Sequence, residues 1–183
     1  MPRVLQFLVL SVLLVISGSS SAQTGAQPPF RLLFSEVKRG SMVTGQRCVL
    51  VFPDRHFHFE LANNKAGRDL DRRIYEGKFS DPDWSYLSDI LDRQEFRDLN
   101  VRQLAAPLVV EDLHLIAISV WRDGKFQNME FLNNRSRAPY EATLKPLLQW
   151  WKSFSSRKMP ESREPADKHC ALQGAAGDSV FAH

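Results

Sequence analysis

The segment LHLIAISVWRDGKFQNMEFL, residues 113–132, sets the fold, because two runs of β-forming residues flank Asp123-Gly124. Asp-Gly between such runs is a strong local signal for a two-residue β-hairpin turn. With these residues in the turn, four cross-strand pairs follow: Trp121–Phe126, Val120–Gln127, Ile118–Met129 and Ile116–Phe131. The last three pairs bring Ile116, Ile118, Val120, Met129 and Phe131 to one face. We expect this face to point into the core.

A second hairpin is predicted upstream, in RCVLVFPDRHFHFEL, residues 47–61. Arg47–Phe52 has the composition of a buried strand, and His56–Leu61 alternates polar and apolar residues. The residues between them favour a turn, since proline presets φ and the Asp54 side chain can bond its own backbone. Residues 62–70 are interpreted as an exposed loop. Two further β-like runs are Phe30–Lys38 and Arg72–Lys78.

Two helices are predicted. Residues 80–83 (SDPD) supply an N-cap hydroxyl, acids for the positive helix end, and a proline in the first turn. An apolar stripe follows at Trp84, Leu87, Ile90 and Leu91. The second helix is expected from Thr143 to Ser155, with Thr143 as N-cap so that Pro146 falls in the first turn. Its apolar stripe is Leu144, Leu147, Leu148, Trp151 and Phe154.

Strands that cluster into hairpins, with no βαβαβ alternation, predict an α+β domain. We expect a mostly antiparallel sheet of five to six strands, with two helices packed on one face. The predicted organisation is a signal peptide at 1–22, a flexible lead-in at 23–29, one domain at 30–156 and a disordered tail at 157–183.

Four segments resemble a group of small exported bacterial proteins that have no assigned activity: CVLVFPDRHFHFE, IYEGKFSDPDWSYLSDILDRQEFRDL, ISVWRDGKFQNMEFLNN and LKPLLQWWKSF. The shared features are a hairpin with a Pro-Asp-Gly-like turn, a Y-E-G strand before a helix, a second hairpin and a closing P-L-L-x-W helix. The resemblance covers most of residues 47–154. This chain carries Arg55 where that turn usually has glycine. The resemblance implies the same α+β fold and supplies no catalytic residues.

The first residues predict export. Arg3 precedes an apolar run over residues 4–16, and Ser20 and Ala22 have the spacing of a signal-peptidase site. We expect cleavage after Ala22, no stable membrane anchor afterwards, and a periplasmic or extracellular location. The whole chain has 24 Lys+Arg and 21 Asp+Glu, a formal charge of +3, and the two signs are interleaved. Nucleic acid is therefore not an expected partner.

A metal site is the first candidate for chemistry. His56, His58 and Glu60 alternate along one predicted strand, and imidazole and carboxylate groups suit Zn²⁺ or Cu²⁺. The favoured interpretation is simpler: Phe57 and Phe59 occupy the other face, so the histidines mark the solvent side of an amphipathic strand. His114 shares its parity with core residues, which predicts a hydrogen-bonded, half-buried histidine. No cofactor is predicted.

Aromatic residues provide a candidate binding patch at Trp121, Phe126 and Trp150. Trp121 and Phe126 lie on the half-polar face of the predicted hairpin, and Trp150 is one residue off the apolar stripe of its helix, so partial exposure is expected. The alternative is a stabilising cross-strand pair with no binding role. The acids Asp81 and Asp83 are explained by helix capping rather than by acid–base catalysis.

Cys48 and Cys170 lie in an exported chain, where a disulfide is permitted. Because Cys170 lies in a segment with no ordering signal, we expect the two thiols not to meet. No common catalytic motif is present in the sequence. The sequence thus favours an exported, non-enzymatic module that binds an unidentified protein or small ligand. A metal-binding protein using His56 and His58 and a small hydrolase with a scattered site are the alternatives.

Overall fold

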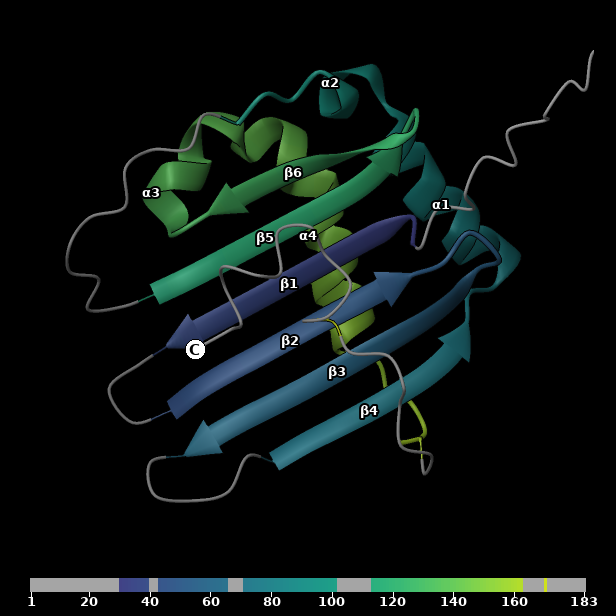
Figure 1. Cartoon of the computed structure of the whole chain (residues 1–183), viewed down its shortest axis with the longest axis vertical. Helices are drawn as coiled ribbons and strands as arrows, with labels where there is room; N and C mark the ends of the chain where they lie inside the picture. Colours follow the sequence, from purple (N-terminus) through teal and green to yellow (C-terminus); the bar gives the residue numbers. More distant parts are fainter. Residues whose placement is uncertain (1–29, 40–42, 66–70, 102–112, 163–169, 171–183) are drawn as a thin grey trace, which may run out of the picture.

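The computed structural model describes residues 30–39, 43–65, 71–101, 113–162 and 170 (Figure 1). The elements are β1 (Leu32–Arg39), β2 (Val43–Val51), β3 (His56–Lys65), β4 (Asp71–Lys78), α1 (Asp81–Asp92), α2 (Gln94–Arg97), β5 (Leu113–Arg122), β6 (Lys125–Phe131), α3 (Asn134–Arg137), the 3-10 turn η1 (Ala138–Tyr140) and α4 (Glu141–Ser155). The predicted signal peptide and lead-in, and most of the predicted tail, lie outside the described residues.

The strands form a six-stranded sheet in the order β4-β3-β2-β1-β5-β6, and every neighbouring pair is antiparallel. Helix α4 crosses behind the sheet, and α1 packs at the same side (Figure 1). The predicted α+β class is therefore confirmed. Within the described residues, no helix is long and apolar enough to cross a membrane.

The hairpin around Asp123-Gly124, β5–β6, has the predicted register. Trp121 pairs with Phe126, and the pairing continues to Ile116 with Phe131. The turn residues Asp123 and Gly124 have φ values of 47° and 79°. Two consecutive positive φ values are what a type I′ turn needs, and Asp-Gly meets this need at low cost.

The first hairpin, β2–β3, also has its turn at residues 53–55, but β3 runs on to Lys65. The expectation of a loop from residue 62 is therefore wrong up to Lys65, because the backbone there continues to pair with β2. Residues 66–70 lie outside the described part. Arg55 has φ 74°, in the left-handed region where glycine is usual. Its carbonyl accepts the Phe79 N–H at 3.0 Å, and its guanidinium contacts Asp81.

Helix α1 begins at its predicted N-cap residue, whereas α4 begins before its predicted N-cap residue. Ser80 caps α1 by accepting the Asp83 N–H at 3.4 Å, as predicted. The expectation that Thr143 starts the last helix is wrong: α4 begins at Glu141, directly after η1, so Pro146 lies inside the helix. The 3-10 turn already sets the chain on a helical path, and five buried residues of α4 offset the missing N–H.

The sheet buries residues on both faces. The main core lies between one face and α1, α2 and α4, and it includes Phe34, Phe59, Ile118, Leu91 and Trp151. The opposite face of the sheet, called the second face from here on, carries a smaller cluster. It contains Phe30, Leu33, Cys48, Leu50 and Cys170. The polar side chains that lie beside this smaller cluster form the candidate site.

Candidate functional site

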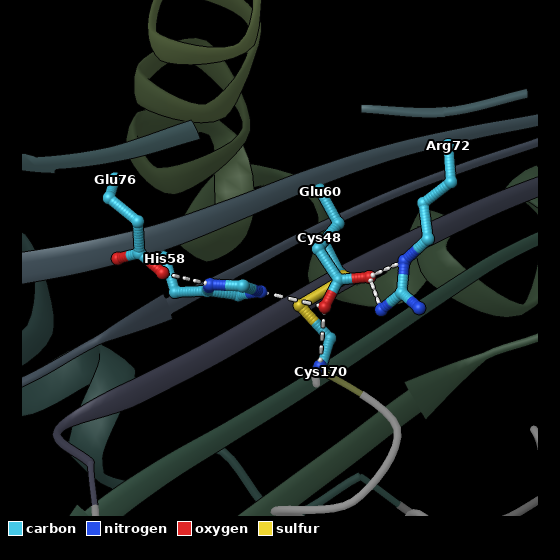
Figure 2. Close-up of a disulfide and its surroundings, with 6 residues drawn as sticks. All are labelled: Cys48, His58, Glu60, Arg72, Glu76 and Cys170. Atoms are coloured by element: carbon cyan, nitrogen blue, oxygen red, sulfur yellow. Dashed lines mark hydrogen bonds and ion pairs between the residues drawn. A yellow bond between two sulfur atoms is a disulfide. The ribbon is translucent and has the colours of Figure 1, made fainter. Parts of the chain in front are cut away.

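A disulfide joins Cys48 on β2 to Cys170, whose Cα atoms are 6.2 Å apart (Figure 2). The expectation that these thiols do not meet is wrong. After α4 the chain reaches the sheet edge, where the Ser162 N–H donates to the Ile74 carbonyl of β4 at 2.8 Å. Cys170 then lies on the second face of the sheet, which brings it to Cys48. Both cysteines are 1% exposed.

Strand pairing places a carboxylate and an imidazole beside this disulfide. Glu60 on β3 is directly opposite Cys48 on β2, and His58 is directly opposite Glu76 on β4. Directly opposed residues have side chains on the same face, and so do residues two apart on one strand. The register alone therefore gathers these four side chains on the second face (Figure 2).

His58 is fully buried, at 0% exposed. The expectation that its strand face is the solvent side is therefore wrong at this residue. Protonated His58 donates from Nδ1 to Glu76 Oε1 at 2.5 Å and from Nε2 to Glu60 Oε1 at 2.7 Å. Burial lowers the pKa of His58, but the two carboxylates outweigh burial and raise it.

Glu60 is ionised inside the fold. Its Oε1 accepts the Cys170 N–H at 3.0 Å, and its Oε2 accepts Arg72 Nε–H at 2.9 Å. Burial raises the pKa of Glu60, but the His58, Cys170 and Arg72 hydrogen bonds and the Arg72 charge bring it down to about 2. A charged carboxylate thus accepts a hydrogen bond from the backbone of the disulfide-bonded Cys170.

His56 lies in a different setting. It is exposed at the start of β3, and its Nδ1 is 2.8 Å from Asp54 Oδ2. Asp54 keeps a lowered pKa, chiefly through its hydrogen bonds with His56. The predicted set His56, His58 and Glu60 is therefore split between an exposed turn and a buried cluster. Among the described residues, the potential ligand group that comes together is Cys48, Glu60 and Cys170.

A second buried carboxylate, Glu36, lies on the helix-covered face and has no counterpart in the sequence predictions. It accepts Trp151 Nε1–H at 2.9 Å and contacts His114 Nε2 at 2.7 Å, Lys38 Nζ at 3.0 Å and the Arg47 guanidinium. His114 is half-buried and hydrogen-bonded, as expected. Glu36 was not found from the sequence, since its partners come from β1, β2, β5 and α4.

The predicted aromatic patch is also divided. Trp121 and Phe126 form the expected cross-strand pair with ring centroids 4.7 Å apart, and Phe126 stacks on Phe30 at 4.9 Å. Trp150 is 3% exposed and packs in the main core, on the other side of the sheet. The expectation that Trp150 is partly exposed is wrong, because α4 turns both Trp150 and Trp151 towards the sheet.

A cavity of about 580 Å³ lies between the α1–α2 segment and the first turns of α4. Its lining residues are Ile90, Arg93, Glu95, Phe96, Ala142, Thr143 and Pro146. The charged residues Arg93 and Glu95 are exposed, and Ile90 and Phe96 are core residues. The cavity therefore presents no buried charged group to a ligand.

No family model matches the chain, and no curated protein matches its sequence. The resemblance to small exported proteins consequently rests on the sequence segments quoted above.

Proposed function

We propose that this chain is an exported, non-enzymatic binding module that receives an extended peptide along the outer edge of β6. The observation that supports this proposal is the position of β6 at the end of the sheet. An edge strand presents backbone N–H and C=O groups that another extended chain can pair with.

The hairpin geometry identifies the groups that face outward. In a two-residue hairpin the pair next to the turn, here Arg122 and Lys125, is hydrogen-bonded, and bonded pairs then alternate. Phe126, Asn128 and Glu130 therefore direct their N–H and C=O groups away from β5. Among the described residues, no backbone partner for these groups is found.

The opposite edge of the sheet is different. There the Ser162 N–H donates to the Ile74 carbonyl, so the segment after α4 already occupies part of the β4 edge. The β6 edge is also continuous over Lys125–Phe131 and contains neither proline nor a bulge, two devices that protect edges from pairing.

The side chains of β6 add specificity to backbone pairing. An added strand would place alternate side chains on the second face, beside Phe126, Asn128 and Glu130. The half-buried Phe126, backed by Trp121, supplies an apolar contact at the turn end. Glu130 supplies a negative charge at the other end. Phe126 and Glu130 together favour an extended peptide that has one apolar and one basic side chain on the same face.

Export is part of the proposal because the signal-like N-terminus and the Cys48–Cys170 bridge support it together. A buried structural disulfide persists in oxidising compartments. A periplasmic or extracellular module of this kind is stabilised covalently, and β6 ends its sheet.

A displayed library of random decapeptides tests the proposal, with the oxidised chain as bait. Glu130→Pro removes one outward N–H without touching a bond to β5, and Glu130→Ala is the matched control. We expect selected peptides to bind the proline variant about fivefold more weakly, beyond any loss in the alanine variant, since each backbone hydrogen bond contributes about 1 kcal/mol. Selection of no peptide, or equal binding by both variants, would contradict edge pairing.

A further inference from the structure

We infer that the buried cluster around Cys48 and Cys170 becomes a Zn²⁺ site when the disulfide is reduced. The Sγ atoms of the two cysteines and a carboxylate oxygen of Glu60 all lie within 4.8 Å of one another. All three residues are buried. Three potential metal ligands are therefore already close together, two of them on the paired strands β2 and β3.

His58 lies outside the group that is within 4.8 Å, but it contacts Glu60 and would supply the fourth ligand after a small shift. Its Nε2 is 2.7 Å from Glu60 Oε1, the carboxylate oxygen that also accepts the Cys170 N–H. Its other ring nitrogen, Nδ1, is 2.5 Å from Glu76 Oε1 (Figure 2). In metal sites a ligating histidine almost always donates its second N–H to a carboxylate, a backbone carbonyl or water, which fixes the tautomer and the orientation of the ring.

Glu60 is oriented in the same manner. Arg72 holds Oε2 through Nε and Nη2, which leaves Oε1 directed at Cys170 and His58. Two thiolates, one imidazole and one carboxylate are a donor set that suits tetrahedral Zn²⁺. The supporting contacts from Arg72 and Glu76 are present before any metal enters.

A dithiol is the reductant that opens the Cys48–Cys170 disulfide. The dithiol transfers two electrons and two protons to the disulfide and is itself oxidised to a disulfide, so Cys48 and Cys170 become thiols. Binding of Zn²⁺ then releases two thiol protons and the Nε2 proton of His58. The Arg72 charge offsets the negative charge of a site with two thiolates and the Glu60 carboxylate.

Cys170 can therefore be held beside Cys48 in two ways that exclude each other. In the oxidised chain a covalent bond holds Cys170 against β2, and in the reduced chain the metal ion holds it there. His56 takes no part, because it pairs with Asp54 at the exposed turn. This sets the site apart from a histidine pair along β3.

The test uses Co²⁺ as a spectroscopic probe, followed by displacement with Zn²⁺. The full chain is compared in its oxidised form and after reduction and removal of the reductant under nitrogen. We expect one equivalent of Co²⁺ with a thiolate-to-metal charge-transfer band in the reduced chain only. Glu60→Gln and His58→Gln should each weaken binding by more than about 10-fold, since loss of even an outer-shell partner of a metal ligand costs about 10–100-fold. The matched control His56→Gln should leave binding unchanged.

Folding of the reduced chain is followed at the same time by circular dichroism. If reduction loosens the chain, Zn²⁺ should restore its ordered signal, because metal binding is coupled to folding. Absence of the charge-transfer band from the reduced chain, whether it is folded or unfolded, would overturn the inference. So would a band that neither Glu60→Gln nor His58→Gln weakens, since the cysteines alone would then bind the ion.

Discussion

Replacement of Glu36 by glutamine tests how a buried carboxylate stabilises this fold. Glu36 is 5% exposed and lies among Trp151, His114, Lys38 and Arg47. Glutamine keeps the shape of the side chain, removes its charge and so mimics the protonated acid. The substitution therefore isolates the contribution of ionised Glu36.

The magnitude follows from the pKa of Glu36. Burial raises this pKa, but hydrogen bonds from Trp151, His114 and Lys38 and the Arg47 charge lower it from 4.5 to about 2. At 1.36 kcal/mol per pH unit, the difference corresponds to about 3 kcal/mol. Because the folded pKa is depressed, this stability is fully present above pH 4.5 and is lost as the pH falls towards 2.

Urea unfolding of the oxidised protein at two pH values provides the measurement. At pH 7, Glu36→Gln should lower the free energy of unfolding by about 3 kcal/mol. At pH 3 the deficit should shrink to about 1.5 kcal/mol, because folding then recovers only part of the ionisation energy. Acid effects at Glu60 are common to both proteins and cancel in this difference.

Glu161→Gln is the control for loss of one negative charge. Glu161 is exposed, and its substitution should change the free energy of unfolding by less than about 0.5 kcal/mol. A deficit below about 1 kcal/mol for Glu36→Gln at pH 7 would refute the reasoning. A deficit that stays constant between pH 7 and pH 3 would also refute it, since the effect would then not come from ionisation.

Three further substitutions probe the covalent and backbone features. Removing the bridge with Cys48→Ala and Cys170→Ala together should cost about 5 kcal/mol in chemical denaturation, because it frees a loop with a sequence separation of 122. Gly77→Ala should lose about 1–3 kcal/mol in the same assay, since its Cβ would lie 2.5 Å from the Phe57 ring. Arg55→Gly should be more stable than Arg55→Ala by about 1 kcal/mol in thermal unfolding, because φ is 74° there.

Each of these three predictions can be contradicted by a specific result. A double cysteine variant as stable as the oxidised protein would mean that the bridge does not constrain the unfolded chain. A Gly77→Ala variant of unchanged stability would mean that the Phe57 ring moves aside freely. Equal stability of the glycine and alanine variants at residue 55 would mean that the turn stores no backbone strain.

The hairpins were predictable because their information is local. Asp123-Gly124 determines both the turn type and the register of β5–β6, and every predicted pair is present. The Ser80 cap and the apolar stripe of α1 likewise depend on neighbours within one turn. The turn at residues 53–55 also contained the signal that places Cys48 opposite Glu60, since turn length sets strand register.

The candidate site itself was only partly predictable. Alternation along β3 correctly put His58 and Glu60 on one face, but it could not show whether that face is exposed to solvent or buried. His58 is buried, whereas His56, two residues away, is exposed. The difference comes from Glu76, which bonds His58, and from Cys170, which bonds the neighbouring Glu60. Both residues are remote in sequence from the two histidines.

The sequence by itself determined the class of the fold, the two hairpins and the capped first helix, because these depend on hydrogen bonds and side-chain patterns between near neighbours. Only the tertiary structure decided that Cys170 reaches Cys48, that Trp150 faces the core and that Glu36 and Glu60 remain ionised in the interior. These outcomes depend on long-range contacts. Cys170, which has no local sequence signal, is placed by its contacts with Cys48 and Glu60. A buried charge is stable only where oppositely charged groups from distant strands and helices lie beside it.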